Sequence, residues 1–146
     1  MEELVKSMKV TLATVFSFYM KAQNYHWNVE GPDFFQYHEL FGKLYADVYG
    51  SVDQMAEEIR ALQSYAPSSY KRFADLSKVE DELKVPTCST MVERLLADND
   101  IVIECLNDSF KHAETHNKQG LMDFLANRID QHNKWGWFLR SSKKED

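Results

Sequence analysis

Apolar residues recur along most of the chain at intervals of three and four positions, which is the spacing of one face of an α-helix. Gly31-Pro32 interrupts the first of these patterns, and Pro32-Asp33 suits the start of the next helix. The pattern therefore predicts four long helices, at about residues 1–29, 33–62, 89–116 and 120–140.

The connections between these helices differ greatly in length. Short links join the first helix to the second and the third to the fourth, so each pair should be antiparallel neighbours. Residues 63–87 form a long connection, and a helix-like patch at Tyr70–Leu76 lies inside it. One long crossover in a four-helix bundle is the ferritin-like arrangement. The expected fold is all-α, a ferritin-like four-helix bundle with a short extra helix in the crossover.

Length and composition fit one globular domain over residues 1–146, with 44% hydrophobic and 27% charged residues. No stretch approaches the roughly 18 uninterrupted apolar residues of a membrane span, and MEELVKSMKV does not resemble a secretory signal. A cytoplasmic protein is therefore expected. Cys88 and Cys105 have no CxxC spacing, so we expect buried free thiols.

The net charge of −6 argues against nucleic-acid backbones as the main partner, because such binding depends on clustered Lys and Arg. An acidic surface suits the attraction of cations instead.

Four residues could together bind such a cation. Asp53 and Glu57 lie four positions apart and share a helix face, while His38 lies on the same helix and His26 near the end of the first. Taken singly, the carboxylates could belong to a solvated face and each histidine could be a hydrogen-bonded core residue. The spacing of the whole set is more informative.

His38 and Asp53 are fifteen residues apart, a rise of about 22 Å on an α-helix. Metal–ligand bonds are only about 2 Å long, so these two side chains cannot share a metal within one chain. If the second helix packs antiparallel against its own copy, however, the histidines of one subunit meet the carboxylates of the other. Mixed imidazole and carboxylate ligands suit ferrous iron or zinc. None of the five histidines has Glu three residues before it, so the usual intra-subunit di-iron motif is absent.

Several segments together resemble one family. YHWNVEGPDF at residues 25–34 is followed by HELF at 38–41 and DQMAEEIRAL at 53–62. The ligand spacing is His-x11-His-x14-Asp-x3-Glu, and His132-Asn133-Lys134 with WFLR at 137–140 resembles the family's closing segment. The chain is similar to the Dps mini-ferritins, which are named for DNA protection during starvation.

The resemblance implies a hollow homo-dodecamer with ferroxidase sites at its two-fold interfaces. Ferrous iron would be oxidised there, preferably by hydrogen peroxide, and stored as ferric mineral. His26 and His38 would supply nitrogen ligands from one subunit, and Asp53 and Glu57 oxygen ligands from its partner, with Glu57 able to bridge to a second iron. Trp27 would either absorb stray oxidising equivalents or be an aromatic residue at an interface.

The chain departs from the family pattern at three places. Gly42 replaces an acidic residue one turn after the second histidine, so a second iron at each site is less well supported. Asp123 resembles the aspartate of the three-fold iron-entry pore, but Lys118 stands where an acidic residue is common. A Lys-rich amino-terminal arm is missing, so DNA binding is not expected.

Two alternatives stay open at this point. The protein could be a structural, DNA-binding cage with vestigial metal sites, or its sites could hold redox-silent zinc. Asp108, His112 and His116 could hold a surface metal, although a solvated helix end is the simpler interpretation. His132 is expected to be a structural hydrogen-bonding residue.

Overall fold

The computed structural model describes residues 1–143, and the last three positions of the expected 1–146 domain lie outside the described residues. The helices are α1 (Glu2–Asn28), α2 (Phe34–Ala61), α3 (Tyr70–Leu76), α4 (Cys88–Thr115) and α5 (Gln119–Ser141). Each long helix begins and ends within one residue of its predicted bounds, and α3 is the predicted crossover helix. The all-α, ferritin-like four-helix bundle is confirmed.

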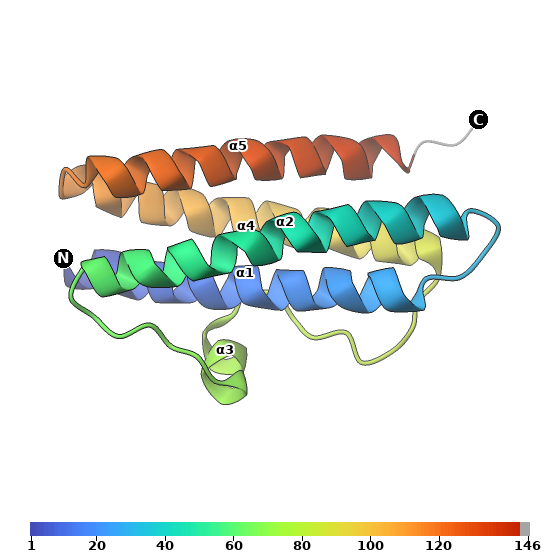
Figure 1. The fold of residues 1–146 in the computed structure, drawn as a ribbon, viewed down its shortest axis with the longest axis horizontal. Helices are drawn as coiled ribbons and strands as arrows, with labels where there is room; N and C mark the ends of the chain where they lie inside the picture. The colour runs from blue at the N-terminus through green and yellow to red at the C-terminus, as the bar shows by residue number, and fades with distance from the viewer. Residues whose placement is uncertain (144–146) are drawn as a thin grey trace.

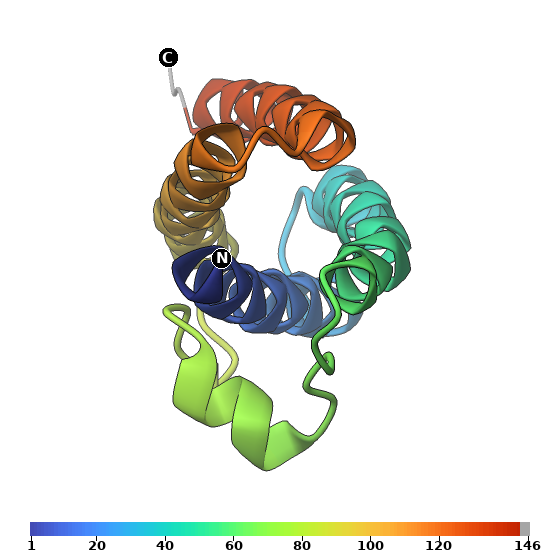
Figure 2. The same ribbon diagram turned by 90° about the vertical axis from the view of Figure 1, so that its left-hand side faces the viewer.

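The four long helices lie side by side, and α3 packs outside the bundle against α1 (Figure 1). Viewed from the end, α1, α2, α4 and α5 surround a common centre (Figure 2). Short turns make α1 and α2, and likewise α4 and α5, antiparallel neighbours. The connection from α2 to α4 runs along the outside of α1, which fixes the direction of the second helix pair.

The core is made by apolar residues on the inward-facing sides of the long helices. They are almost completely buried, and burial of such a side chain stabilises the fold by about 1.5–3 kcal/mol. The largest fully buried ones are Leu4, Met8, Leu12, Phe18, Tyr25, Phe41, Leu44, Met55, Ile59, Met91, Leu95 and Leu106. Phe34, the first residue of α2, is by contrast 43% exposed.

The turn between α1 and α2 depends on Gly31. Its φ is +129°, a conformation that residues with a Cβ atom rarely adopt, and its carbonyl accepts a hydrogen bond from the Phe34 N–H at 3.1 Å. The chain reverses within a few residues, which brings the end of α1 beside the start of α2.

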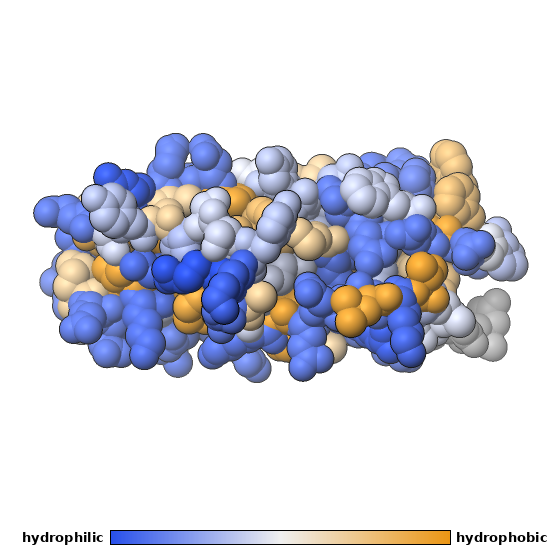
Figure 3. Space-filling model, turned by 90° about the horizontal axis from the view of Figure 1, so that it is seen from below, coloured by the Kyte–Doolittle hydropathy of each residue, from blue (hydrophilic) through white to orange (hydrophobic). Residues whose placement is uncertain are grey.

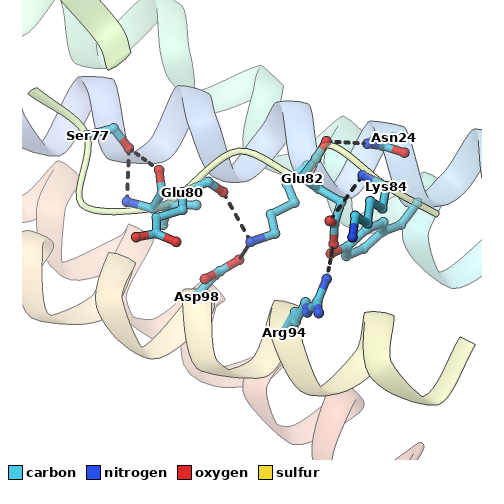
Figure 4. A network of polar contacts seen from close by, with 10 residues as sticks. Asn24, Ser77, Glu80, Glu82, Lys84, Arg94 and Asp98 are labelled. Carbon is cyan, nitrogen blue, oxygen red and sulfur yellow. Dashed lines mark hydrogen bonds and ion pairs between the residues drawn. The ribbon is translucent and has the colours of Figure 1, made fainter. Parts of the chain in front are cut away.

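A buried lysine holds the crossover onto the bundle. Lys21 of α1 donates to the Glu80 carbonyl oxygen at 3.2 Å and forms an ion pair with Asp98 of α4 at 2.8 Å (Figure 4). The side chains of Lys21 and Asp98 are only 8% and 11% exposed. Burial raises the pKa of Asp98, whereas Lys21 opposes that shift. One charge pair therefore links α1, α4 and the crossover.

Glu82 makes a second set of polar contacts two residues further along the crossover. Its carboxylate accepts a hydrogen bond from the Tyr25 hydroxyl at 2.6 Å and pairs with Arg94, while its carbonyl oxygen accepts from the Asn24 amide (Figure 4). The hydrogen bond from Tyr25, helped by Arg94, lowers the pKa of Glu82. These contacts attach the crossover beside the end of α1.

The surface around the crossover is mostly hydrophilic, with apolar side chains in small separate groups (Figure 3). Leu83 and Val85 are the crossover's strongly exposed aliphatic residues, at 88% and 55%.

Within residues 1–143, no helix combines the length and apolar character needed to cross a bilayer. Cys105 is buried and Cys88 half-buried, and both are free thiols, so the expectation of burial is met fully only at Cys105.

His132 is a structural hydrogen-bonding residue, as predicted. It is completely buried, and its Nδ1 lies 2.8 Å from the Asn99 side-chain oxygen, while its Nε2 lies 3.3 Å from Arg128. Arg128 in turn binds both carboxylate oxygens of Asp47 on α2. Because Arg128 can only donate, His132 accepts through Nε2 and donates through Nδ1–H. The neutral ring joins α4 and α5, and Arg128 extends the connection to α2.

This buried histidine predicts acid sensitivity. Burial lowers the pKa of His132 to about 3, from an ordinary value near 6.5. Between these pH values the unfolded chain binds a proton that the folded chain excludes, so stability should fall as the pH drops from 6.5 towards 3. The expected slope is about 1.4 kcal/mol per pH unit. Urea unfolding at several pH values in this range measures the free energy of unfolding of wild type and of His132→Gln. This free energy should fall more steeply with decreasing pH in wild type than in the variant. An equal pH dependence in the two proteins would contradict the prediction.

Candidate metal site

The structure brings two of the four predicted ligands together. His26 lies in the last turn of α1 and His38 in the second turn of α2, on either side of the Gly31 corner. Their imidazole rings stack with centroids 3.9 Å apart and planes inclined by 17°. Both residues are half-buried. The tight corner thus produces a histidine pair within a single chain.

The two rings are oriented by reciprocal hydrogen bonds to backbone. His26 Nδ1 lies 2.5 Å from the His38 carbonyl oxygen, and His38 Nδ1 lies 2.6 Å from the His26 carbonyl oxygen. A carbonyl oxygen only accepts, so each Nδ1 carries a proton, and the neutral form of each ring has its lone pair on Nε2. Metal-binding histidines are commonly oriented in this way by a hydrogen bond from their other nitrogen. The pair is therefore prepared to offer two nitrogen ligands.

Gly42 makes room for one of these rings. A Cβ atom at this position would lie 2.8 Å from both Cε1 and Nδ1 of His26, closer than packed atoms normally approach. An acidic side chain here, as in many family members, could fit only if His26 moved. The departure noted in the sequence is therefore coupled to the position of a predicted ligand.

We expect Gly42→Ala to displace the His26 ring and weaken metal binding by about 10–100-fold, the usual cost of disturbing the groups that orient a ligand. Calorimetric titration with Zn²⁺ measures this directly. Gly120→Ala is the matched control, because a Cβ atom there meets nothing within 4 Å. Equal affinities for the two variants would show that Gly42 does not position His26.

The surface around the histidine pair is open and partly apolar. His26, His38, Gly42 and Ala46 line a shallow depression together with Phe35, whose side chain is 72% exposed. Trp27, which follows His26 in the chain, is 64% exposed. Large exposed aromatic side chains beside a partly apolar depression are typical of a surface that a partner covers.

The carboxylates lie elsewhere on the same helix. Asp53 and Glu57 are exposed near the other end of α2, which runs without interruption from His38 to Asp53. In the part of the chain that the structure describes, no three His, Cys, Asp or Glu side chains gather as a metal requires. A single subunit therefore holds two separated half-sites, and the complete ligand set stays a prediction.

The other candidate residues lie away from this pair. Asp123 is exposed near the start of α5 and lines an open, polar pocket with Gln54, Asn127 and Arg128. Lys118 is the residue that precedes α5. His112 Nε2 lies 3.7 Å from a carboxylate oxygen of Asp108 near the end of α4, a spacing that neighbouring turns of a solvated helix end produce.

Sequence reasoning missed Gly42's contact with His26 and the hydrogen bonds from Nδ1. The contact between Gly42 and His26 had one indication in the sequence, which was the position of Gly42 one turn after His38. The backbone acceptors have no signature in the sequence, since every residue carries a carbonyl group.

The fold agrees with comparisons against known proteins. The model of the ferritin-like domain matches residues 6–143. The chain belongs to the ferritin-like family. Its relatives identify this ferritin-like protein as a Dps mini-ferritin, as the sequence motifs predicted.

General stress protein 20U of Bacillus subtilis is 28% identical to this mini-ferritin, covering 96% of the chain and 97% of that protein. DNA protection during starvation protein 2 of Bacillus anthracis is 25% identical, covering 96% of each. The crystal structure of Dps from Staphylococcus aureus superposes with a TM-score of 0.94 at 25% identity, over 100% of this chain and 98% of that one.

Proposed function

We propose that this mini-ferritin is a ferroxidase that oxidises Fe²⁺ with hydrogen peroxide and stores the ferric product as mineral inside a dodecameric cage. The observation that carries the proposal is the pair of stacked imidazoles whose Nδ1 atoms are both bound to backbone carbonyls. Two oriented nitrogen ligands on an open, partly apolar surface form half of a metal site and lack only oxygen ligands.

Asp53 and Glu57 of a second subunit supply those oxygens in the proposed site. For His38 of one α2 to meet these residues of an antiparallel copy, the two-fold axis must pass near residues 46–47, midway between the half-sites. Ala46 is small and exposed there, so the two helices can approach closely. The same contact would cover Phe35 beside the histidines.

Iron is the proposed substrate of this site. Two imidazoles and two carboxylates accept ferrous iron and leave positions open for an oxidant, although the same set also accepts zinc. The role of Trp27 beside the site and that of Asp123 in iron entry belong to the same proposal. Gly42 favours one firmly held iron at each site over two.

Alanine substitution of the histidines tests the proposal. His26→Ala/His38→Ala should abolish peroxide-driven formation of ferric iron, followed by absorbance, while light scattering still shows a particle of twelve chains. Asp108→Ala/His112→Ala on α4 is the control and should retain wild-type rates. Unchanged iron oxidation in the His26/His38 variant would refute the site.

Two further measurements separate the alternatives. Anomalous scattering on both sides of the iron edge identifies the bound metal and would reveal a zinc site. A gel shift at physiological salt tests the structural, DNA-binding alternative, for which the acidic charge predicts no shift.

A further inference from the structure

A row of tyrosine rings begins at the histidine pair. The Tyr45 ring meets His26 edge-on with centroids 5.2 Å apart. Tyr45 lies 6.1 Å from Tyr19, and Tyr19 lies 4.7 Å from Tyr49, again between ring centroids. Three oxidisable side chains and one proposed iron ligand are therefore in successive contact along the interface of α1 and α2.

The direction of this row along α2 is informative. Tyr45 and Tyr49 follow His38 by seven and eleven residues, so they share its face of the helix. Asp53 follows Tyr49 by four residues, one turn or about 6 Å further along. The row therefore starts at the histidine half-site and ends one turn before the carboxylate half-site of the same subunit.

In the two-fold dimer these half-sites belong to two different iron sites. We propose that Tyr45, Tyr19 and Tyr49 form an electron path that joins the two iron sites of a dimer, so that two sites with one Fe²⁺ each reduce one hydrogen peroxide together. The inference rests on the proposed ferroxidase function and adds a means of coupling its sites.

The need for such a path follows from the electron balance. Cleavage of the O–O bond of hydrogen peroxide to two waters takes two electrons and two protons, whereas one Fe²⁺ gives one electron. A lone Fe²⁺ would release a hydroxyl radical. With the path, Fe²⁺ at one site gives the first electron and Tyr45 gives the second, losing its phenolic proton. Electrons from Tyr19, Tyr49 and finally the second Fe²⁺ restore each phenol. In sum, two Fe²⁺, one H₂O₂ and two protons give two Fe³⁺ and two H₂O.

The surroundings of Tyr19 suit a reversible relay. Its hydroxyl donates to the Gln23 side-chain oxygen at 2.9 Å, which gives the proton an acceptor nearby. Burial, with Tyr49 and Tyr45 adding to it, raises the pKa of Tyr19, so the phenol is protonated before it is oxidised. Tyr49, at 55% exposed, lies at the outer end of the row.

Tyr45→Phe tests the path because it keeps the ring and removes the oxidisable hydroxyl. The assembled protein is loaded with one Fe²⁺ per site, mixed with half an equivalent of peroxide and freeze-quenched for electron paramagnetic resonance. Hydroxyl radical is measured in parallel with a spin trap, and Zn²⁺ titration confirms that the site still binds metal. Tyr70→Phe, at an 83% exposed position on α3, is the control.

Wild type and Tyr70→Phe should give a transient tyrosyl signal and little trapped hydroxyl radical. Tyr45→Phe should lose most of that signal and release several-fold more hydroxyl radical at unchanged Zn²⁺ affinity. If Tyr45→Phe gives the same tyrosyl signal and the same amount of trapped hydroxyl radical as wild type, the electron path is refuted, whereas the proposed ferroxidase function is not. A tryptophanyl signal that disappears in Trp27→Phe would refute it equally, by assigning the donor to Trp27. A wild type that does not oxidise Fe²⁺ would overturn the proposed function itself.

Discussion

When two inactive variants assemble together in equal amounts, about a quarter of the iron-oxidation sites are expected to be intact, compared with all of them in wild type. One variant lacks the histidines, His26→Ala/His38→Ala, and the other lacks the carboxylates, Asp53→Ala/Glu57→Ala. In a mixed dimer one site receives both sets of substitutions and the other receives none. Random mixing makes half of the dimers mixed, and each of these has one intact site of two.

The measurement is the rate of peroxide-driven iron oxidation by co-expressed chains with different affinity tags, purified for both tags. The histidine variant co-expressed with a second tagged copy of itself is the control, and it should stay inactive. A mixture as inactive as its two parents would show that the four residues do not form a site between subunits.

Lys21→Ala is expected to lower the free energy of unfolding by about 3–5 kcal/mol, the largest stability effect we predict for a single side chain. The substitution leaves the carboxylate of Asp98 buried without its charge partner and removes the hydrogen bond to the Glu80 carbonyl. Both losses act where the crossover joins α1 and α4 (Figure 4). Chemical unfolding at fixed chain concentration measures the change, since assembly itself contributes to stability.

Lys43→Ala provides a matched control on α2. Lys43 pairs with Glu39 at 3.3 Å, but the two side chains are 70% and 52% exposed, so its removal should cost less than about 1 kcal/mol. Lys21→Met combined with Asp98→Leu should recover most of the stability lost in Lys21→Ala, because apolar side chains replace the buried charges. Equal losses in Lys21→Ala and Lys43→Ala would contradict the structural role of Lys21.

The helices were predictable because their cause is local. Apolar residues at three-and-four spacing select one face, and Gly31-Pro32 stops the first helix wherever the rest of the chain lies. The short helix at Tyr70–Leu76 could be recognised for the same reason, and its Ser69 accepts a hydrogen bond from the Arg72 N–H at its start. His132 was also assigned correctly, because a histidine on an apolar stripe has to satisfy its nitrogens within the core.

The sequence predicts which residue types form the candidate site and how they are spaced, but it does not predict the local surroundings of the histidines. Fifteen residues between His38 and Asp53 already separate them on one helix, whatever the tertiary structure. In the sequence, by contrast, Gly42 could be interpreted only as a missing acidic ligand. The structure shows why a side chain does not fit there, because the His26 ring lies against Gly42.

The sequence by itself determined the helices, the direction of the chain through them and the distance along one helix that separates His38 from Asp53 and Glu57. These follow from periodicity and helical rise, which act between near neighbours. The tertiary structure alone decided that the imidazoles stack with their Nδ1 atoms on each other's backbone, and that Tyr19 of α1 lies between Tyr45 and Tyr49 of α2. Such contacts depend on how two helices pack through space, and side-chain packing across a helix interface has no period in the sequence.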